Sequence, residues 1–258
     1  MLKIDFYYFG EQCPHNSRMR HLLSSLDSRE YQVNFYDITD DYQTAKRLNI
    51  YSPTLMIFND ELRWNGPITV DIIHKISRGD IPKVQPYQVE QSNNVTVGST
   101  KFLTEETVFD TCTACMGGKE YYYDKSEWIK KMKRDFGIEH LGILHYNNEE
   151  CVGGAEYVPS LIVPYPIPKG KDIAFLTCSY LSDENADYKG YPLKVLEEEL
   201  FKLGYKTLLA IVSEKVVFPN GTLKWFIDRG YVDLGELFYE ERDFARMHLV
   251  KKELGGKH

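Results

Sequence analysis

The stretch 174-AFLTCSYLSDENADYKGYPLKVLEEEL-200 decides how the second half of this chain folds. Its apolar start belongs to a buried strand that we predict from Ile173 to Leu181. Its end predicts a helix from Pro192 to Leu203, because leucines recur there at helical spacing and proline suits a first helical turn. A polar loop joins the two. The sequence therefore places a helix N-terminus, with its unpaired N–H groups, after a buried strand.

The residues that follow continue the alternation of strands and helices. A further buried strand is predicted from Thr207 to Val212. Asn220 is predicted to cap a short helix from Leu223 to Asp228, which Gly230 ends. Final strands are predicted at Tyr231 to Tyr239 and Ala245 to Lys251.

The residues before the deciding stretch predict one helix and one hairpin. The helix runs from Ser126 to Phe136, with Ser126 as its N-cap and Gly137 as its C-cap. The hairpin pairs a strand at 141–146 with one at 151–159, because Asn147-Asn148 between them is a turn signal. This half of the chain therefore predicts strands and helices around one sheet.

From about residue 102 to residue 254, this succession of elements resembles the GNAT superfamily of acyl-CoA-dependent N-acyltransferases. The resemblance is carried by the strand, the loop Lys189-Gly190-Tyr191-Pro192, the helix, the next strand and the ending Trp225-Phe226-Ile227-Asp228-Arg229-Gly230-Tyr231. The run Gly153-Gly154-Ala155-Glu156-Tyr157-Val158-Pro159 is similar to a small subgroup called YoaP-like. The resemblance implies an α/β (α+β) fold with a central mixed sheet. It also implies transfer of an acetyl (acyl) group from acetyl-CoA to an amine, with no metal.

The resemblance also implies which residues serve this transfer. Glu156 is implied as the general base, with His140 and His145 as rivals, and a solvent-facing Glu156 without a catalytic role stays an alternative. The residues implied to bind acetyl-CoA are Ser179, Tyr180, Leu181, Lys189, Gly190, Tyr191, Leu193, Lys194, Asn220 and Phe226.

Three positions depart from the pattern of the superfamily. Asp187 stands where the phosphate loop usually has Gln or Arg, and Pro192, which has no N–H, stands where Gly or Ala is usual. The loop is acidic, and Lys189 and Lys194 are expected to offset its repulsion of phosphates. Phe226 replaces the tyrosine that commonly protonates the departing thiolate, so the general acid has to be another group.

The first part of the chain predicts the element order β-α-β-α-β-β-α. Strands are predicted at 3–9, 31–38 and 54–58, a hairpin closed by Trp64, and helices at 17–26, 41–48 and 69–77. Periodicity is then lost over residues 81 to 100. We therefore predict domains at 1–82 and 102–258, joined by a linker at 83–101.

The segment Cys13-Pro14-His15-Asn16 lies between the first strand and the first helix, and Ser52-Pro53-Thr54 precedes the third strand. Over about residues 1 to 80 the chain resembles the thioredoxin and glutaredoxin family. That family has a second cysteine where this chain has Asn16, which excludes a dithiol cycle within the motif. A scaffold role and monothiol chemistry at Cys13 remain as alternatives. A thiol at a helix N-terminus is expected to favour its thiolate.

The pair Cys112 and Cys115 forms a Cys-x-x-Cys motif in the second domain. It lacks the second well-spaced pair that a zinc site needs, so no metal is predicted. A redox pair and reduced structural thiols are the alternatives, and Cys13 is a possible exchange partner for either cysteine.

Composition narrows the classes of function. The formal charge of −7 argues against nonspecific nucleic-acid binding, which needs a basic face. No apolar run reaches the length needed to span a membrane, and the start of the chain lacks the pattern of a secretory signal, so a cytoplasmic protein is predicted. The acceptor amine is expected to be a small molecule or peptide, and its identity and the oligomeric state are left open. Alternative functions are a non-catalytic adaptor and a monothiol oxidoreductase.

Overall fold

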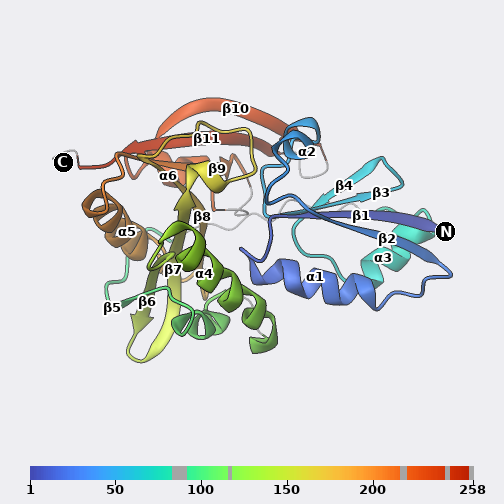
Figure 1. Ribbon diagram of the computed structural model, residues 1–258, viewed down its shortest axis with the longest axis horizontal. Coiled ribbons are helices and arrows are strands. Elements are labelled where there is room, and N and C mark those ends of the chain that lie inside the picture. The colour runs from blue at the N-terminus through green and yellow to red at the C-terminus, as the bar shows by residue number, and fades with distance from the viewer. Residues whose placement is uncertain (83–91, 116–117, 216–219, 242–244, 256–258) are drawn as a thin grey trace.

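The strands of this chain form one four-stranded and one seven-stranded sheet, which lie on the right and the left of Figure 1. The structure is a computed structural model that describes residues 1–82, 92–115, 118–215, 220–241 and 245–255. The predicted linker at 83–101 falls in part, at 83–91, outside the described residues. The predicted mixed α/β class is confirmed, because both sheets combine parallel and antiparallel neighbours.

The four-stranded sheet has the strand order β2-β1-β3-β4. Its strands are β1 (Leu2–Tyr8), β2 (Tyr31–Asp37), β3 (Thr54–Phe58) and β4 (Leu62–Asn65). The helices between and after them are α1 (Pro14–Ser24), α2 (Tyr42–Arg47) and α3 (Val70–Ser77). The predicted element order is confirmed. Helix α1 begins at Pro14 instead of Ser17, because proline is compatible with the first helical turn.

Strand β1 is buried on both faces, and each face belongs to a different core. Ile4 and Phe6 pack with the buried residues of α1 and α3. Tyr7 and Phe9 belong instead to the core of the seven-stranded sheet. Successive strand residues point to opposite faces, so one strand serves both cores. The two sheets are therefore joined by packing as well as by the chain.

The seven-stranded sheet has the order β10-β11-β9-β8-β7-β6-β5. Its strands are β5 (Ser99–Phe102), β6 (Gly142–Asn147), β7 (Glu150–Pro159), β8 (Ile173–Leu181), β9 (Thr207–Ser213), β10 (Val232–Glu240) and β11 (Ala245–Glu253). The helices are α4 (Tyr122–Phe136), α5 (Gly190–Lys202) and α6 (Leu223–Ile227), with 3-10 turns η1 (Thr107–Thr113), η2 (Lys119–Tyr121) and η3 (Ser160–Ile162). Strands β8 and β9 are parallel, whereas the other neighbours in this sheet are antiparallel.

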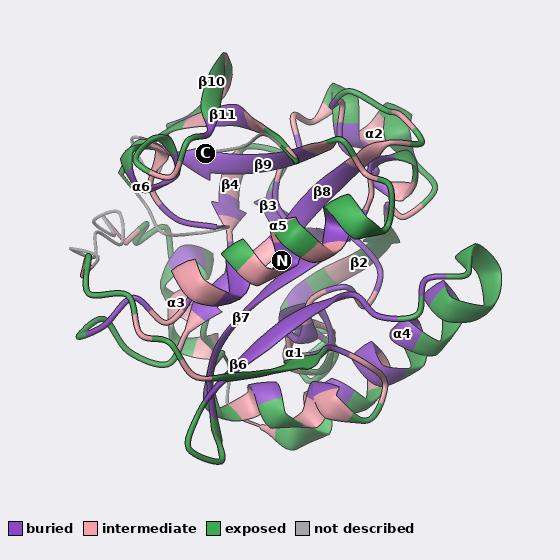
Figure 2. Ribbon diagram, turned by 90° about the vertical axis from the view of Figure 1, so that its left-hand side faces the viewer, coloured by how far each residue is buried: buried purple, intermediate pink, exposed green. Residues whose placement is uncertain are grey.

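Helix α5 lies across the large sheet (Figure 2). Leu193, Leu196 and Leu200 are buried, whereas Lys194 on the same helix is exposed. Figure 2 also shows that β7 and β8 are buried along most of their length. No helix among the described residues is long and apolar enough to cross a membrane.

The predicted starts of α4 and α5 were wrong, whereas α6 starts at Leu223 as predicted but with another cap. Helix α4 begins at Tyr122, so Ser126 lies inside it and its hydroxyl donates to the carbonyl of Glu105. Helix α5 begins at Gly190, which places Pro192 in its first turn but not at its first position. Helix α6 is capped by Thr222, whose hydroxyl accepts from the N–H of Trp225. The side chain of Asn220, which was predicted to cap α6, instead donates to the carbonyls of Leu176 and Ile211.

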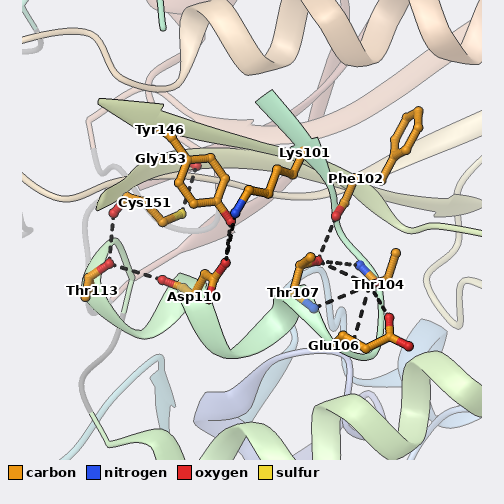
Figure 3. Close-up of polar contacts among 10 residues, drawn as sticks. All are labelled: Lys101, Phe102, Thr104, Glu106, Thr107, Asp110, Thr113, Tyr146, Cys151 and Gly153. Carbon is orange, nitrogen blue, oxygen red and sulfur yellow. Dashed lines mark hydrogen bonds and ion pairs between the residues drawn. The ribbon is translucent and has the colours of Figure 1, made fainter. Parts of the chain in front are cut away.

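The edge of the large sheet at β5 is held by turn η1 (Figure 3). The hydroxyl of Tyr146 donates to the carboxylate of Asp110 at 2.6 Å, and the Lys101 ammonium lies 4.3 Å from the centre of the Tyr146 ring. Thr113, at the end of η1, donates to the carbonyl of Cys151 at 2.9 Å. These contacts fix the turn against β6 and β7, and thereby the position of Cys115 that follows it.

Polar contacts also join the two sheets at the buried carboxylate of Glu240 in β10. The amide of Asn65 donates to it at 2.6 Å, and the guanidinium of Arg63 lies 3.3 Å from it. A second contact joins the helices, because Ser17 of α1 donates to Asp124 of α4 at 2.7 Å. Partners from the two sheets therefore satisfy each other's polar groups.

We expect Glu240→Ala to lower the free energy of unfolding by about 1–3 kcal/mol, because it leaves Arg63 and Asn65 without their shared acceptor. The matched control is Glu236→Ala, which removes an exposed ion pair with Arg246 from the same strand and should cost about 0–1 kcal/mol. Urea unfolding measures both. Equal losses in the two variants would show that the Glu240 contact does not stabilise the junction.

Candidate functional site

The parallel strands β8 and β9 pair over only part of their length. Their register runs from Ile173 opposite Thr207 to Leu176 opposite Ala210, and ends there although both strands continue. The side-chain amide of Asn220 bridges the two strands at this point, donating to the carbonyls of Leu176 at 3.4 Å and Ile211 at 2.9 Å. We call the space between the separating strands the β8–β9 opening.

The backbone of Asn220 adds two more contacts at the β8–β9 opening. Its carbonyl accepts from the hydroxyl of Ser179 and from the ammonium of Lys189, each at 2.8 Å. Asn220 therefore does not cap α6, as was predicted, because both its amide and its carbonyl hold the separating strands. Ser179 and Asn220, both predicted for the donor site, do lie together here.

The N-terminus of α5 is occupied by a carboxylate of the chain itself. Asp187 accepts from the N–H groups of Gly190 at 2.8 Å and Lys189 at 3.2 Å. Its other oxygen pairs with the guanidinium of Arg229. Pro192 has no N–H to offer. The anion site predicted at this helix N-terminus is thus filled by Asp187, so an external phosphate would compete with that carboxylate.

Lys189 does not point toward the predicted phosphate position. It is 1% exposed, and its ammonium lies 4.1 Å from the centre of the Trp225 ring and 5.9 Å from that of Phe226. It forms no ion pair with any residue in the part of the chain that the structure describes. Its expected role of offsetting the acidic loop by facing phosphates was therefore wrong, because its side chain runs into the interior.

Burial changes the ionisation of Lys189. Loss of hydration lowers the pKa of its ammonium to about 7, against an opposing effect of the Asp187 carboxylate. Arg229 lowers this pKa further, and the Cys178 thiolate would raise it. The pKa lies near neutrality, where the amine changes readily between its charged and neutral forms.

Glu156 is buried and paired, which excludes the solvent-facing alternative. It is 3% exposed, as is Lys125 of α4, whose ammonium lies 2.7 Å from each of its carboxylate oxygens. Burial alone would lower the pKa of Lys125, but the Glu156 carboxylate reverses this and the net shift is upward. In the sheet Glu156 stands opposite Cys178 of β8, just past the last paired residues of β8 and β9.

Three thiols gather around the Lys125–Glu156 pair. Cys13, Cys115 and Cys178 all interact electrostatically with this pair. Burial raises the pKa of the Cys13 thiol to about 12. The expected stabilisation of the Cys13 thiolate by the helix dipole was therefore wrong, because loss of hydration outweighs it.

The first cysteine of the Cys-x-x-Cys motif is Cys112, which interacts electrostatically with Cys151. Among the described residues no three His, Cys, Asp or Glu side chains are grouped closely enough to hold a metal ion. The thiols of this motif therefore face two different surroundings.

The two rival histidines have aromatic and backbone partners. His140 stacks on Phe102 with ring centres 4.1 Å apart. His145 is fully buried, and its Nδ1 is 2.9 Å from the carbonyl of Tyr188. Both are held by the β5–β6 side of the sheet. Neither is placed beside Glu156's partner Lys125.

The remaining residues predicted for donor binding divide into three groups. Tyr180 is buried against Gly154 of β7, and its hydroxyl has no hydrogen-bond partner. Leu193 and Phe226 belong to the core. The half-exposed or exposed ones are Leu181, Tyr191 and Lys194.

Sequence reasoning missed three residues of this site. Lys125 is buried on the same face of α4 as Tyr122, Ile129 and Met132. This face could not be recognised for Lys125 from the sequence, because the helix was predicted to start at Ser126. Arg229 and Trp225 were quoted only as part of a motif. Their contact, with the Arg229 guanidinium 3.7 Å from the centre of the Trp225 ring, depends on the turn after α6.

Comparisons with known proteins give structural matches only. No family model matches the chain, and no curated protein matches it. A ribosomal-protein-alanine N-acetyltransferase from Brucella melitensis is 14% identical with a TM-score of 0.44, covering 60% of this chain and 99% of that chain. An aminoglycoside 6′-N-acetyltransferase from Enterococcus faecium is 12% identical with a TM-score of 0.43, covering 62% and 99%. An aminoglycoside 6′-N-acetyltransferase complexed with coenzyme A is 12% identical with a TM-score of 0.44, covering 62% and 99%.

We expect Glu156→Gln to lower the free energy of unfolding by about 3–5 kcal/mol, because Lys125 is then buried without a charged partner. Replacing both residues, Lys125→Met with Glu156→Leu, should recover most of this loss. Urea unfolding of Lys125→Met, Glu156→Leu and the double variant measures the coupling. Independent, additive losses would contradict a tightly coupled pair.

Lys189 should make the stability depend on pH. Its pKa is about 7 in the folded chain and ordinarily 10.5, so between these values the unfolded chain binds the additional proton. The contribution of Lys189 to stability therefore rises with pH over this window and is flat below pH 7. Lys189→Met should remove the rise, whereas Lys202→Met at the exposed end of α5 should keep it. Parallel curves of unfolding free energy against pH for wild type and Lys189→Met would contradict this.

Proposed function

We propose that this chain is a GNAT-type N-acyltransferase that moves an acetyl group from acetyl-CoA to an amine. The observation that carries the proposal is the β8–β9 opening, with α5 starting beside it and the Lys125–Glu156 pair one strand away. Ligands of open α/β sheets bind outside the carboxyl ends of the strands. The β8–β9 opening lies at the carboxyl ends of the two parallel strands of this sheet.

The β8–β9 opening suits an extended donor that carries amides. Beyond Leu176 and Ala210 the two strands no longer pair with each other. The carbonyls of Leu176 and Ile211 accept from Asn220 and the N–H of Ser213 donates to Gly221, so the other facing backbone groups need further partners. The amide groups of an acyl-pantetheine arm are partners of that kind. Two polar side-chain atoms there, Asn220 Oδ1 and Trp225 Nε1, are buried and have no hydrogen-bond partner among the described residues. A polar ligand would satisfy them.

Glu156 remains our choice for the group that accepts the proton of the attacking amine. It is the buried carboxylate opposite Cys178 on β8, and Lys125 holds both of its oxygens. A proton taken up by Glu156 would weaken this ion pair, and Lys125 holds the carboxylate in position. Lys125 is accordingly a positioning residue in the proposed reaction.

The diphosphate of the donor would have to compete with a side chain of this protein. Asp187 fills the N-terminus of α5, so binding of a diphosphate there requires that its carboxylate move aside and release Arg229. The first-turn N–H groups and this guanidinium would then face the phosphates. Ser179, Leu181, Tyr191 and Lys194 remain proposed contacts of the donor.

The first sheet is proposed to be a thioredoxin-like unit, supported by its order β2-β1-β3-β4 and by Cys13 at the start of α1. The domain boundaries at 1–82 and 102–258 and the YoaP-like subgroup belong to the same proposal. Monothiol chemistry is not our choice for this unit, because the thiolate that such chemistry uses is disfavoured by the raised pKa of Cys13. Its packing on the second sheet supports a structural role beside the Lys125–Glu156 pair.

Isothermal titration of the purified chain with acetyl-CoA tests the donor site, with desulfo-CoA and ADP as controls. We expect micromolar binding of acetyl-CoA, and formation of an acetylated amine when spermidine, an aminoglycoside or a basic peptide is added as a probe. A folded chain that binds no acetyl-CoA would overturn the proposal.

Asp187→Asn tests how the diphosphate is held. If the phosphates displace Asp187, removing its charge should tighten acetyl-CoA binding about fivefold, about 1 kcal/mol at a helix terminus. The matched control is Asp183→Asn, which makes the same change of charge at an exposed position of the same loop. An equal effect of the two substitutions on the dissociation constant would show that the diphosphate does not occupy the N-terminus of α5.

A further inference from the structure

Transfer of an acyl group from a thioester expels sulfur as a thiolate, which is released most easily when it gains a proton. The group that supplies this proton has to lie at the β8–β9 opening and to carry a proton near neutral pH. Phe226 lies there but has no proton to give. The donor must therefore be another side chain among those that surround Asn220.

The other ionisable groups near the opening are poorly suited. Arg229 does not lose its proton in proteins. Asp187 is bound to Arg229 and to the N-terminus of α5. Burial raises the pKa of the Cys178 thiol and of the Tyr180 hydroxyl far above their ordinary values. The ring of Tyr180 also lies over Gly154 of β7, on the side of β8 away from β9.

Lys189 lies at the β8–β9 opening and carries transferable protons on its ammonium. Its side chain enters the opening from the start of α5, and its ammonium donates to the carbonyl of Asn220 at 2.8 Å. That carbonyl and two aromatic rings are its neighbours, and it makes no ion pair with the described residues. Because no ion pair with the described residues holds this ammonium, its proton can be transferred to a ligand. Asn220 Oδ1 and Trp225 Nε1, both buried and unpartnered, indicate that a polar ligand completes this same place.

We propose that Lys189 is the catalytic acid of the transfer, giving its proton to the sulfur as the thioester breaks. This rests on the proposed function. The amine nitrogen forms a bond to the acyl carbon, the carbon–sulfur bond breaks, and its electron pair stays on sulfur. The proton moves from Lys189 to that sulfur, while Glu156 takes the proton lost by the amine. Glu156 then releases its proton to solvent and Lys189 regains one from solvent, so that thioester and amine become amide and thiol with no net uptake of protons.

The surroundings of Lys189 set the pH at which this works. Burial holds the pKa of its ammonium at about 7, Asp187 raises it, and Arg229 lowers it. Cys178 of β8 is the remaining titratable neighbour. The rate of the transfer should therefore fall as pH rises through this pKa, because the neutral amine has no proton to give.

The test compares wild type with Lys189→Met and Lys189→Arg, with spermidine as the probe acceptor. Release of thiol from acetyl-CoA should fall about 100-fold in kcat in both variants, with little change in KM, because general acids contribute about 10²–10⁴-fold. With acetyl-seleno-CoA the loss should shrink to less than about 10-fold, because a selenolate is a better leaving group and needs the proton less. Lys202→Met, at the exposed end of α5, is the matched control and should behave as wild type.

A second measurement needs no turnover. In protein labelled with ¹³C at the lysine Cε atoms, one resonance should titrate near pH 7, and it should be absent from the spectrum of Lys189→Met. Retained turnover in Lys189→Met, or an equal loss with the thioester and the selenoester, would overturn the inference while leaving the proposed function intact. A wild-type chain that releases no thiol from acetyl-CoA would instead overturn the proposed function, and this inference with it.

Discussion

Asn220 sets the constraint on which the rest of the site depends. Its amide bridges the carbonyls of Leu176 and Ile211 where β8 and β9 separate, and its own carbonyl accepts from Ser179 and Lys189. This one buried residue thereby links the two parallel strands where their pairing ends. It also holds the Ser179 hydroxyl and the Lys189 ammonium by hydrogen bonds. Because each bond lies in a water-excluded place, the loss of one would leave unsatisfied polar groups that cost free energy.

The site combines two buried cations that differ in their partners. Lys125 is matched by Glu156, so its charge is fixed and its pKa rises. Lys189 has a carbonyl and aromatic rings as neighbours, so its pKa falls to about 7. Groups with pKa values pushed in opposite directions divide acid and base roles between them. In the proposed reaction the carboxylate held by Lys125 accepts a proton and Lys189 donates one.

The sequence predicted most strands of both sheets, because apolar runs and alternation identify buried strands directly. Ile173–Leu181 and Thr54–Phe58 have the predicted bounds. Helix starts were harder, since capping depends on tertiary partners. Ser126 resembled an N-cap, but its hydroxyl bonds to Glu105, and the hidden first turn of α4 carries Lys125. The burial of the Lys189 side chain could not be predicted either, because the sequence around a lysine that precedes a glycine does not indicate whether the side chain faces solvent or the interior.

The central claim is that the β8–β9 opening receives the acyl donor. Hydrogen–deuterium exchange of the full chain with and without acetyl-CoA tests it most directly, because a ligand that pairs with free strand amides slows their exchange. We predict that protection increases at residues 177–181 of β8, at 211–212 of β9 and in the first turn of α5, with little change in the four-stranded sheet. Unchanged exchange at these residues under saturating acetyl-CoA, or protection confined to the four-stranded sheet, would contradict it.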